Sequence, residues 1–153
     1  MLDNRHSESK GELLVERAGD GSVMPLLGLA FWRMKHAFER EVGLSVATWF
    51  LLAMLIDEDG ISQGDVSERF EVDPSRITRL AQRLEKEGLL RRKRDPEDNR
   101  VVRLHVTEEG RRLIESRQER REGFEDRLRR EFSSEEMAEF RRALNVVVRV
   151  MED

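Results

Sequence analysis

The chain has 153 residues, a length that suits one globular domain around one hydrophobic core. Hydrophobic residues make up 38% of it and charged residues 39%, a composition that favours long helices with solvated faces. There is no cysteine and no apolar run of about 18 residues, so disulfides, thiolate metal sites, thiol redox sensing and a transmembrane helix are excluded.

Charge is distributed unevenly along the chain. The formal net charge is −4, which taken alone argues weakly against nucleic-acid binding. Between Arg76 and Arg103, however, ten basic residues outnumber five acidic ones, so this stretch carries +5 and the remainder −9. A basic block on an acidic body is typical of a nucleic-acid-binding face. The alternative is a set of solvated, arginine-rich helices, and charge alone does not separate the two.

The first part of the chain predicts a tail and two helices. Residues 1–20 are expected to form a flexible tail, because Gly19-Asp20-Gly21 interrupts any helix. Apolar residues at helical spacing predict a helix near Pro25–Glu41. The next helix begins after Ser45 and is almost wholly apolar over residues 49–56, so it should be the most buried element.

Two shorter helices should follow. Ser62 can cap the first of them, in which Val66 and Phe70 form an inward i, i+4 pair. Asp73-Pro74 opens the second, since aspartate accepts hydrogen bonds from free amides and proline suits the first helical position. Gly88 is a good residue to end it.

A hairpin and two long helices complete the predicted order. Residues 89–94 and 101–106 read as short strands around a turn of strong turn formers at residues 95–99. Thr107 then caps a very charged helix over residues 108–130. Ser133 and Glu136 fit a capping box for a last helix with a narrow apolar stripe, typical of a helix–helix seam. The stripe contains Met137, Phe140, Leu144, Val147 or Val148, and Met151.

The helix that begins at Pro74 is expected to have two distinct faces. At 100° per residue, one side gathers the apolar residues Ile77, Leu80, Ala81 and Leu84. The opposite side is polar and would present its middle to base edges inside a DNA major groove, with its boundaries nearer the phosphates. A polar outer face is more often only solvated, and the hairpin that follows directly is what favours DNA. The residues expected at base edges are Ser75, Arg79 and Gln82, and those expected at phosphates are Arg76, Arg83 and Lys86.

Arg100 ends the turn of the hairpin. An arginine at such a tip can enter a narrow, electronegative minor groove, and Asp98 or Asp73 could orient it by a bidentate bond. The alternative is a surface ion pair that contributes little. The full set of expected DNA-contacting residues is Ser75, Arg76, Thr78, Arg79, Gln82, Arg83, Lys86, Arg94, Asn99 and Arg100.

Four segments resemble the MarR family of bacterial transcriptional regulators. They are Val72–Leu80, Leu84–Leu89, Asp95–Arg100 and Leu104–Gly110. The likeness covers about residues 61–114, and its most specific part is the Asp-Pro-Glu-Asp-x-Arg turn with Thr-x-x-Gly downstream. The flanking helices match only in number, order and amphipathic character.

The resemblance implies a mainly α fold with a small β-hairpin wing. Residues 21–153 would form one domain, with a winged helix-turn-helix at 61–107 and dimerisation helices at 22–44 and 108–153. It also implies an obligate homodimer on a pseudo-palindromic operator, usually a repressor released by a small ligand. On this likeness Arg79 and Gln82 read the major groove of double-stranded DNA, and Arg100 the minor groove.

Two positions depart from the family pattern. Phe70-Glu71 stands where relatives often have leucine followed by glycine or a similar turn residue. Glu71 is therefore expected to be mildly strained if the turn needs a positive φ. His105 occupies a strand position that is commonly apolar.

The family places small-molecule effectors between the dimer lobe and the DNA-reading part. The candidates here are Trp32, Arg33, His36, Trp49 and Phe50, which would suit an aromatic acid. The alternative is that the rings belong to the core, the more frequent outcome for large aromatics at helical spacing.

No enzyme, cofactor or metal site is expected. The histidines His6, His36 and His105 stand apart from other ligating residues, and no phosphate loop or Ser/His/Asp motif occurs. The polar Met1–Ser22 has no signal-peptide core, so we expect a cytoplasmic protein of a bacterium or archaeon. The predicted function is a sequence-specific transcriptional regulator. The alternative is a winged-helix module whose basic face binds an acidic protein partner.

Overall fold

The computed structural model describes residues 22–151, which form six helices and one two-stranded hairpin. The predicted tail at residues 1–20 lies outside this range. The mainly α fold with a hairpin is confirmed, and the element ends lie close to those expected. In chain order the elements are α2 (Met24–Val42), α3 (Val46–Asp57), α4 (Gln63–Arg69), α5 (Pro74–Lys86), β1 (Leu90–Arg94), β2 (Val102–Val106), α6 (Glu108–Arg130) and α7 (Ser134–Val150).

Side-chain caps fix where most of the helices begin. The hydroxyl of Ser45 accepts a hydrogen bond from the Thr48 N–H at 3.1 Å, at the start of α3. Ser62 and Thr107 cap α4 and α6 in the same way. Before α7 the capping box is complete, because the Ser133 N–H donates to the Glu136 carboxylate at 2.8 Å and the Glu136 N–H donates to the Ser133 hydroxyl at 3.2 Å. Each cap satisfies an amide that the helix itself leaves unpaired.

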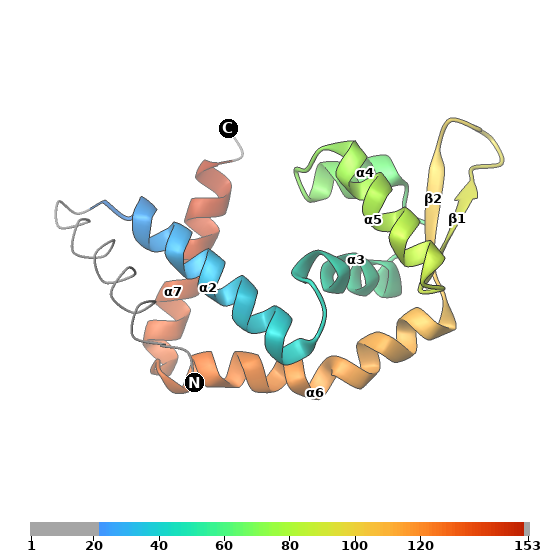
Figure 1. Ribbon diagram of the computed structural model, residues 1–153. Coiled ribbons are helices and arrows are strands. Elements are labelled where there is room, and N and C mark those ends of the chain that lie inside the picture. The colour runs from blue at the N-terminus through green and yellow to red at the C-terminus, as the bar shows by residue number, and fades with distance from the viewer. Residues whose placement is uncertain (1–21, 152–153) are drawn as a thin grey trace, which may run out of the picture.

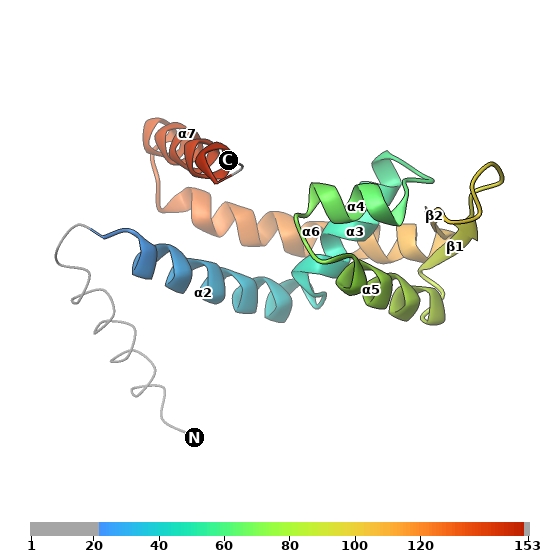
Figure 2. The same cartoon turned by 90° about the horizontal axis from the view of Figure 1, so that it is seen from above.

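The helix α6 joins two parts of the molecule (Figure 1). At its beginning lie α4, α5 and the hairpin, with α3 packed between them and α6. Toward its end lie α2, which runs beside α6, and α7, which turns back from it. The view from above shows α2 and α7 well apart from one another (Figure 2).

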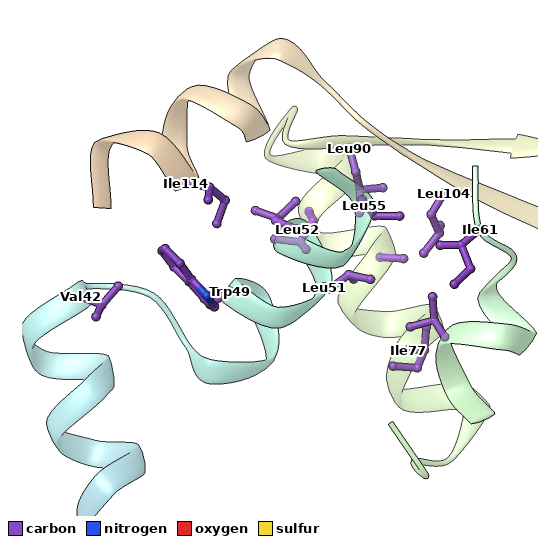
Figure 3. Close-up of a cluster of buried hydrophobic side chains, with 13 residues drawn as sticks. Val42, Trp49, Leu51, Leu52, Leu55, Ile61, Ile77, Leu90, Leu104 and Ile114 are labelled. Carbon is purple, nitrogen blue, oxygen red and sulfur yellow. The ribbon is translucent and has the colours of Figure 1, made fainter. Parts of the chain in front are cut away.

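The core is centred on α3. Leu51, Leu52 and Leu55 are fully buried, and the cluster around them draws residues from every neighbouring element (Figure 3). Burial of each such side chain stabilises the fold by about 1.5–3 kcal/mol relative to exposure. The expectation that this helix is the most buried element is confirmed. The cluster also contains Val42, Trp49, Ile61, Val66, Ile77, Ala81, Leu84, Leu90, Leu104 and Ile114.

The hairpin is tied to the loop between α3 and α4. Its two strands are antiparallel, with Leu90 opposite Val106 and Arg94 opposite Val102. On the other side of β2, the Gly60 N–H donates to the Leu104 carbonyl and the Leu104 N–H donates to the Ile61 carbonyl, both at 2.9 Å. The hairpin is therefore held by backbone hydrogen bonds on both edges of β2.

The helix α7 buries none of its residues within the described part of the chain. Leu144 and Val148 are 38% and 59% exposed, and the apolar stripe predicted for this helix lies largely open. On α2 only Val42 is buried, while Phe31, Trp32 and other large apolar side chains are exposed. None of the helices over residues 22–151 is long and apolar enough to cross a membrane.

Gly110 lets α6 begin directly against the hairpin. It is buried in the first turn of the helix, and a Cβ at this position would lie 2.2 Å from the Leu89 carbonyl oxygen and 2.9 Å from Val106 Cγ2. That carbonyl also accepts the Thr107 N–H at 3.1 Å, so the backbone there has little room to move. Glycine is the residue type that permits this approach.

Gly110→Ala is therefore expected to lower the free energy of unfolding by about 1–3 kcal/mol, because the added methyl group overpacks the junction. Gly123→Ala is the matched control in the same helix, since nothing lies within 4 Å of a Cβ there. That change should raise stability by up to about 1 kcal/mol through helix propensity. Urea unfolding of both variants measures the difference, and equal midpoints would contradict the packing described for Gly110.

Candidate nucleic-acid interface

The helix α5 has the two faces that its sequence predicts. Ile77, Ala81 and Leu84 are buried against α3 and its neighbours, and Leu80 is half-buried. The opposite side is exposed to solvent, which confirms the division into a core face and a polar face. The exposed side chains are Ser75, Arg76, Arg79, Gln82, Arg83 and Lys86.

The beginning of α5 is ordered by Asp73. Its carboxylate accepts the Ser75 N–H at 2.8 Å, and hydrogen bonding to the Ser75 side chain and backbone lowers the pKa of Asp73. Ser75 in turn receives Arg79, whose Nε donates to the Ser75 carbonyl and whose Nη2 donates to the Ser75 hydroxyl, both at 3.2 Å. Arg79 therefore lies back along its own helix, on the exposed face.

The other predicted residues of α5 differ in what holds them. Thr78 is half-buried and accepts the Gln63 amide at 3.1 Å, so it belongs to the junction with α4. Arg83 donates to the Thr48 hydroxyl at 3.0 Å, which ties it to α3. The side chains of Arg76, Gln82 and Lys86 make no hydrogen bond or ion pair with any residue in the described range. They are listed by exposure alone as open to a partner.

The turn between α4 and α5 contains one residue in the left-handed region. Glu71 has φ 49°, the value that was expected to strain a glutamate at this position. Backbone bonds enforce it, because the Glu71 N–H donates to Glu68 at 3.0 Å and the Val72 N–H donates to Ser67 at 3.1 Å. The Ser67 hydroxyl closes the turn by donating to the Val72 carbonyl at 2.6 Å. The left-handed backbone costs about 1–2 kcal/mol for a residue with a Cβ.

The tip of the hairpin is organised by Asp95, which sequence analysis recognised only as a turn former. Its buried carboxylate accepts the N–H groups of Glu97 at 2.8 Å and Asp98 at 3.0 Å, and it forms an ion pair with Arg103. The Arg103 guanidinium, helped by these two amides, lowers the pKa of Asp95. Arg103 also donates to the Gly60 carbonyl at 3.0 Å, so one arginine links the tip to the loop before α4.

Arg100 lies exposed at this tip. Its backbone N–H donates to the Asp98 carboxylate at 2.9 Å, so Asp98 holds the backbone of Arg100 and not its guanidinium. Neither Asp98 nor Asp73 forms an ion pair with Arg100 in the described chain, contrary to the bidentate bond expected for one of them. Beside it, Arg94 donates to the Asn99 carbonyl at 3.4 Å. Both of these residues are exposed.

Two further polar residues at this surface were missed from the sequence. Arg92 of β1 donates through Nε to the Gln63 side-chain oxygen at 3.2 Å. Gln63 is the first residue of α4 and donates to Thr78 of α5. These contacts join residues 15 and 29 positions apart in the chain, and no local pattern identifies them.

The five residues proposed for an effector pocket occupy three separate ring contacts. Trp32 stacks on His36 at a centroid distance of 6.2 Å on the exposed side of α2, where Arg33 is also exposed. Trp49 is buried and meets Phe38 edge-on at 6.1 Å, with the Arg121 guanidinium 5.9 Å from its ring. Phe50 is exposed and packs edge-on against Phe70 at 6.5 Å.

His105 is explained by an ion-pair geometry within the fold. Its Nδ1 lies 2.9 Å from the Asp59 carboxylate, which also accepts the Val106 N–H at 3.1 Å. The imidazole therefore fastens β2 to the end of α3, at a position that is commonly apolar. Over residues 22–151 no group of three or more histidine, aspartate or glutamate side chains is placed to hold a metal ion.

Two short helices, the exposed helix α5 and a hairpin with an arginine at its tip define a winged helix-turn-helix. The sequence model of the MarR family matches residues 44–102, which span α3 to the start of β2. Among curated relatives, YdgJ of Bacillus subtilis, an uncharacterized HTH-type transcriptional regulator, is 36% identical over 99 residues, 65% of this chain and 60% of its own. BilQ of Clostridioides difficile, an HTH-type transcriptional regulator, is 31% identical over 104 residues, 68% of this chain and 70% of its own.

Solved structures agree with this match. The crystal structure of MarR has a TM-score of 0.73 with 29% identity, and the alignment covers 85% of this chain and 90% of that one. The PcaV transcriptional regulator from Streptomyces coelicolor, solved in complex with its natural ligand, has a TM-score of 0.75 with 26% identity, covering 84% and 90%. The chain belongs to the MarR family, and the members of this family are transcriptional regulators and not enzymes. It spans less than two thirds of the length of YdgJ.

Proposed function

We propose that the chain is a sequence-specific DNA-binding regulator of transcription, in which α5 reads the major groove and the hairpin the minor groove. The observation that carries this proposal is α5 itself, with Ile77, Ala81 and Leu84 buried on one side and a wholly exposed polar side on the other. Next to it stands a hairpin whose Arg100 guanidinium has no partner among the described residues. The names of the relatives, which are HTH-type transcriptional regulators, support the same function.

The exposed residues divide by their place on this surface. Residues in the middle of the polar face of α5 would meet base edges, where arginine binds guanine and glutamine binds adenine in bidentate fashion. Residues at its boundary and along the hairpin would meet phosphates. The first group is Ser75, Arg79 and Gln82, and the second is Arg76, Thr78, Arg83, Lys86, Arg94 and Asn99, with Arg100 in the minor groove.

We also propose that the regulator is a homodimer and a repressor that acts in the cytoplasm of a bacterium or archaeon. The exposed apolar side chains of α2 and α7 support the dimer, because contiguous apolar surface of this kind is stabilised by a partner. A two-fold symmetric dimer would match a pseudo-palindromic operator, one half-site to each protomer. In this arrangement residues 22–44 and 108–153 build the dimer lobe of a domain spanning residues 21–153, and residues 61–107 read DNA.

The first experiment is a fluorescence anisotropy titration with DNA from the region upstream of the protein's own gene, with random duplex as competitor. A sequence-specific reader should prefer its site by about 10³-fold or more. Arg79→Ala should cost about 1–3 kcal/mol at particular base pairs and relax the preference there. Arg76→Ala is the control from the same exposed face, and it should weaken operator and random duplex alike.

Two outcomes would contradict this reading of α5. Equal wild-type affinity for operator and random duplex would favour the alternative function, a winged-helix module whose basic face binds an acidic protein. Identical behaviour of the Arg79 and Arg76 variants would show that the division into base-reading and phosphate-binding residues is wrong.

The dimer is tested by sedimentation equilibrium. The wild-type chain should sediment at twice the mass of one chain, and Leu144→Glu combined with Val148→Glu should give monomers, because both charges would enter the apolar stripe of α7. Asn145→Glu, an exposed polar position of the same helix, is the control and should leave the dimer intact. A wild-type monomer at micromolar concentration would overturn the homodimer.

We further propose that a small aromatic acid releases the repressor, with Trp32, Arg33, His36, Trp49 and Phe50 as candidate contacts. The PcaV structure with its natural ligand supports a ligand-responsive mechanism for this fold. Because the chain has only two tryptophans, benzoate as a probe should quench their fluorescence saturably, and Trp32→Phe isolates the response of Trp49. The same probe should dissociate the operator complex. An aromatic-acid panel that changes neither signal would contradict the proposal.

A further inference from the structure

A cleft of about 350 Å³ opens between α5, the beginning of α4 and the hairpin. Four polar residues from these three elements contribute to its lining. Gln63 comes from α4, Thr78 from α5, Arg92 from β1 and Arg100 from the turn between the strands. The cleft therefore lies between the helix proposed for the major groove and the arginine proposed for the minor groove.

Three of these residues belong to one chain of hydrogen bonds. The Nε of Arg92 donates to Gln63 Oε1 at 3.2 Å, and Gln63 Nε2 donates to Thr78 Oγ1 at 3.1 Å. On its other side Arg92 is anchored by Glu85, since the Arg92 N–H donates to Glu85 Oε1 at 2.9 Å and Arg92 Nη1 lies 3.5 Å from Glu85 Oε2. The chain starts and ends on α5, with β1 and α4 between.

The direction of these bonds is set by chemistry. A guanidinium has only donors, so Gln63 must turn its carbonyl oxygen to Arg92 and its amide group to Thr78. The Thr78 oxygen then accepts, and no described residue accepts the hydrogen of its hydroxyl. A hydroxyl that accepts one hydrogen bond donates a stronger one, because bonds in a chain polarise one another. Arg92 thereby makes Thr78 a donor toward the cleft.

The donors at this cleft suit an anion. Thr78 offers its hydroxyl hydrogen, Gln63 a second amide hydrogen, and Arg92 and Arg100 the remaining N–H groups of two guanidinium ions. Glu85 offsets one of these two positive charges, so the lining remains cationic. A phosphate group, which is anionic and at neutral pH accepts hydrogen bonds only, is the constituent of DNA that complements this set.

We propose that the cleft holds one phosphate of the DNA strand that separates the two grooves, bound by Thr78 and Gln63, with Arg92 as the residue that orients both. The strand between a major groove and the adjoining minor groove must cross the space between α5 and Arg100. This inference rests on the proposed DNA-binding function and adds a specific phosphate site and two residues, Gln63 and Arg92, to it.

The test is a scan of the operator in which each phosphate in turn is replaced by a neutral methylphosphonate. Wild-type affinity should fall about tenfold or more at one position in each half-site, as expected for lost hydrogen bonds to a charged group. In Thr78→Val and Arg92→Met the same position should become insensitive, whereas Thr78→Ser should restore it. Arg92→Met should also reduce the slope of log K against log salt concentration by about 0.9.

Arg91→Met is the matched control for Arg92→Met. It makes the same chemical change one residue earlier in β1, on the opposite face of the hairpin and outside the cleft. It should leave the methylphosphonate profile as in the wild type. Circular dichroism checks the fold of each variant, and Thr78→Val, a change on the surface of α5, supplies the answer should Arg92→Met fail to fold.

The outcomes separate this inference from the function on which it rests. Wild-type protein that binds operator and random duplex equally would contradict both. Wild-type protein with a normal operator preference, and a methylphosphonate profile unchanged in Thr78→Val and Arg92→Met, would contradict the phosphate site alone.

Discussion

Leu51, Leu52 and Leu55 of α3 are enclosed on all sides, and the elements that surround them have little other apolar surface to share. The helices α4, α5 and α6 and both strands each contribute side chains to the cluster around α3. Because the hydrophobic effect acts on the whole cluster, the orientation of α5 and the position of the hairpin both follow from how they pack against this one helix. The polar surface is presented by elements whose inner sides are fixed there.

Features encoded within a few residues could be predicted from the sequence. Ser133 and Glu136 announce the start of α7 because a capping box is complete within four residues, and Asp73 does the same for α5. The two faces of α5 follow from helical geometry alone, since burial of Ile77 and Leu84 fixes the opposite side toward solvent. Even Glu71 could be flagged, because the turn chemistry there requires a positive φ that glutamate disfavours.

Features that depend on distant partners could not. Arg83 was assigned to the phosphates from its place on the helix, yet it reaches Thr48, 35 positions away in the chain. The contacts of Arg92 with Gln63 and of Arg103 with Gly60 join hairpin to helix-turn-helix over similar separations. Arginine side chains are long and carry five donors, so their position in the sequence limits little of what they bind. Only the packed fold brings these pairs together.

The length of α6 has a mechanical consequence. Its 23 residues make a continuous rod of about 34 Å, with the contact between Gly110 and the Leu89 carbonyl pressing one end onto the base of the hairpin. A rod of this length that tilts by about 5° about its far end displaces its near end by about 3 Å. Slight angular play where α2 and α7 meet α6 is thus converted into a shift comparable to the spacing of neighbouring base pairs. The helix acts as a lever arm for the hairpin, and Gly110 is the joint through which that motion is transmitted.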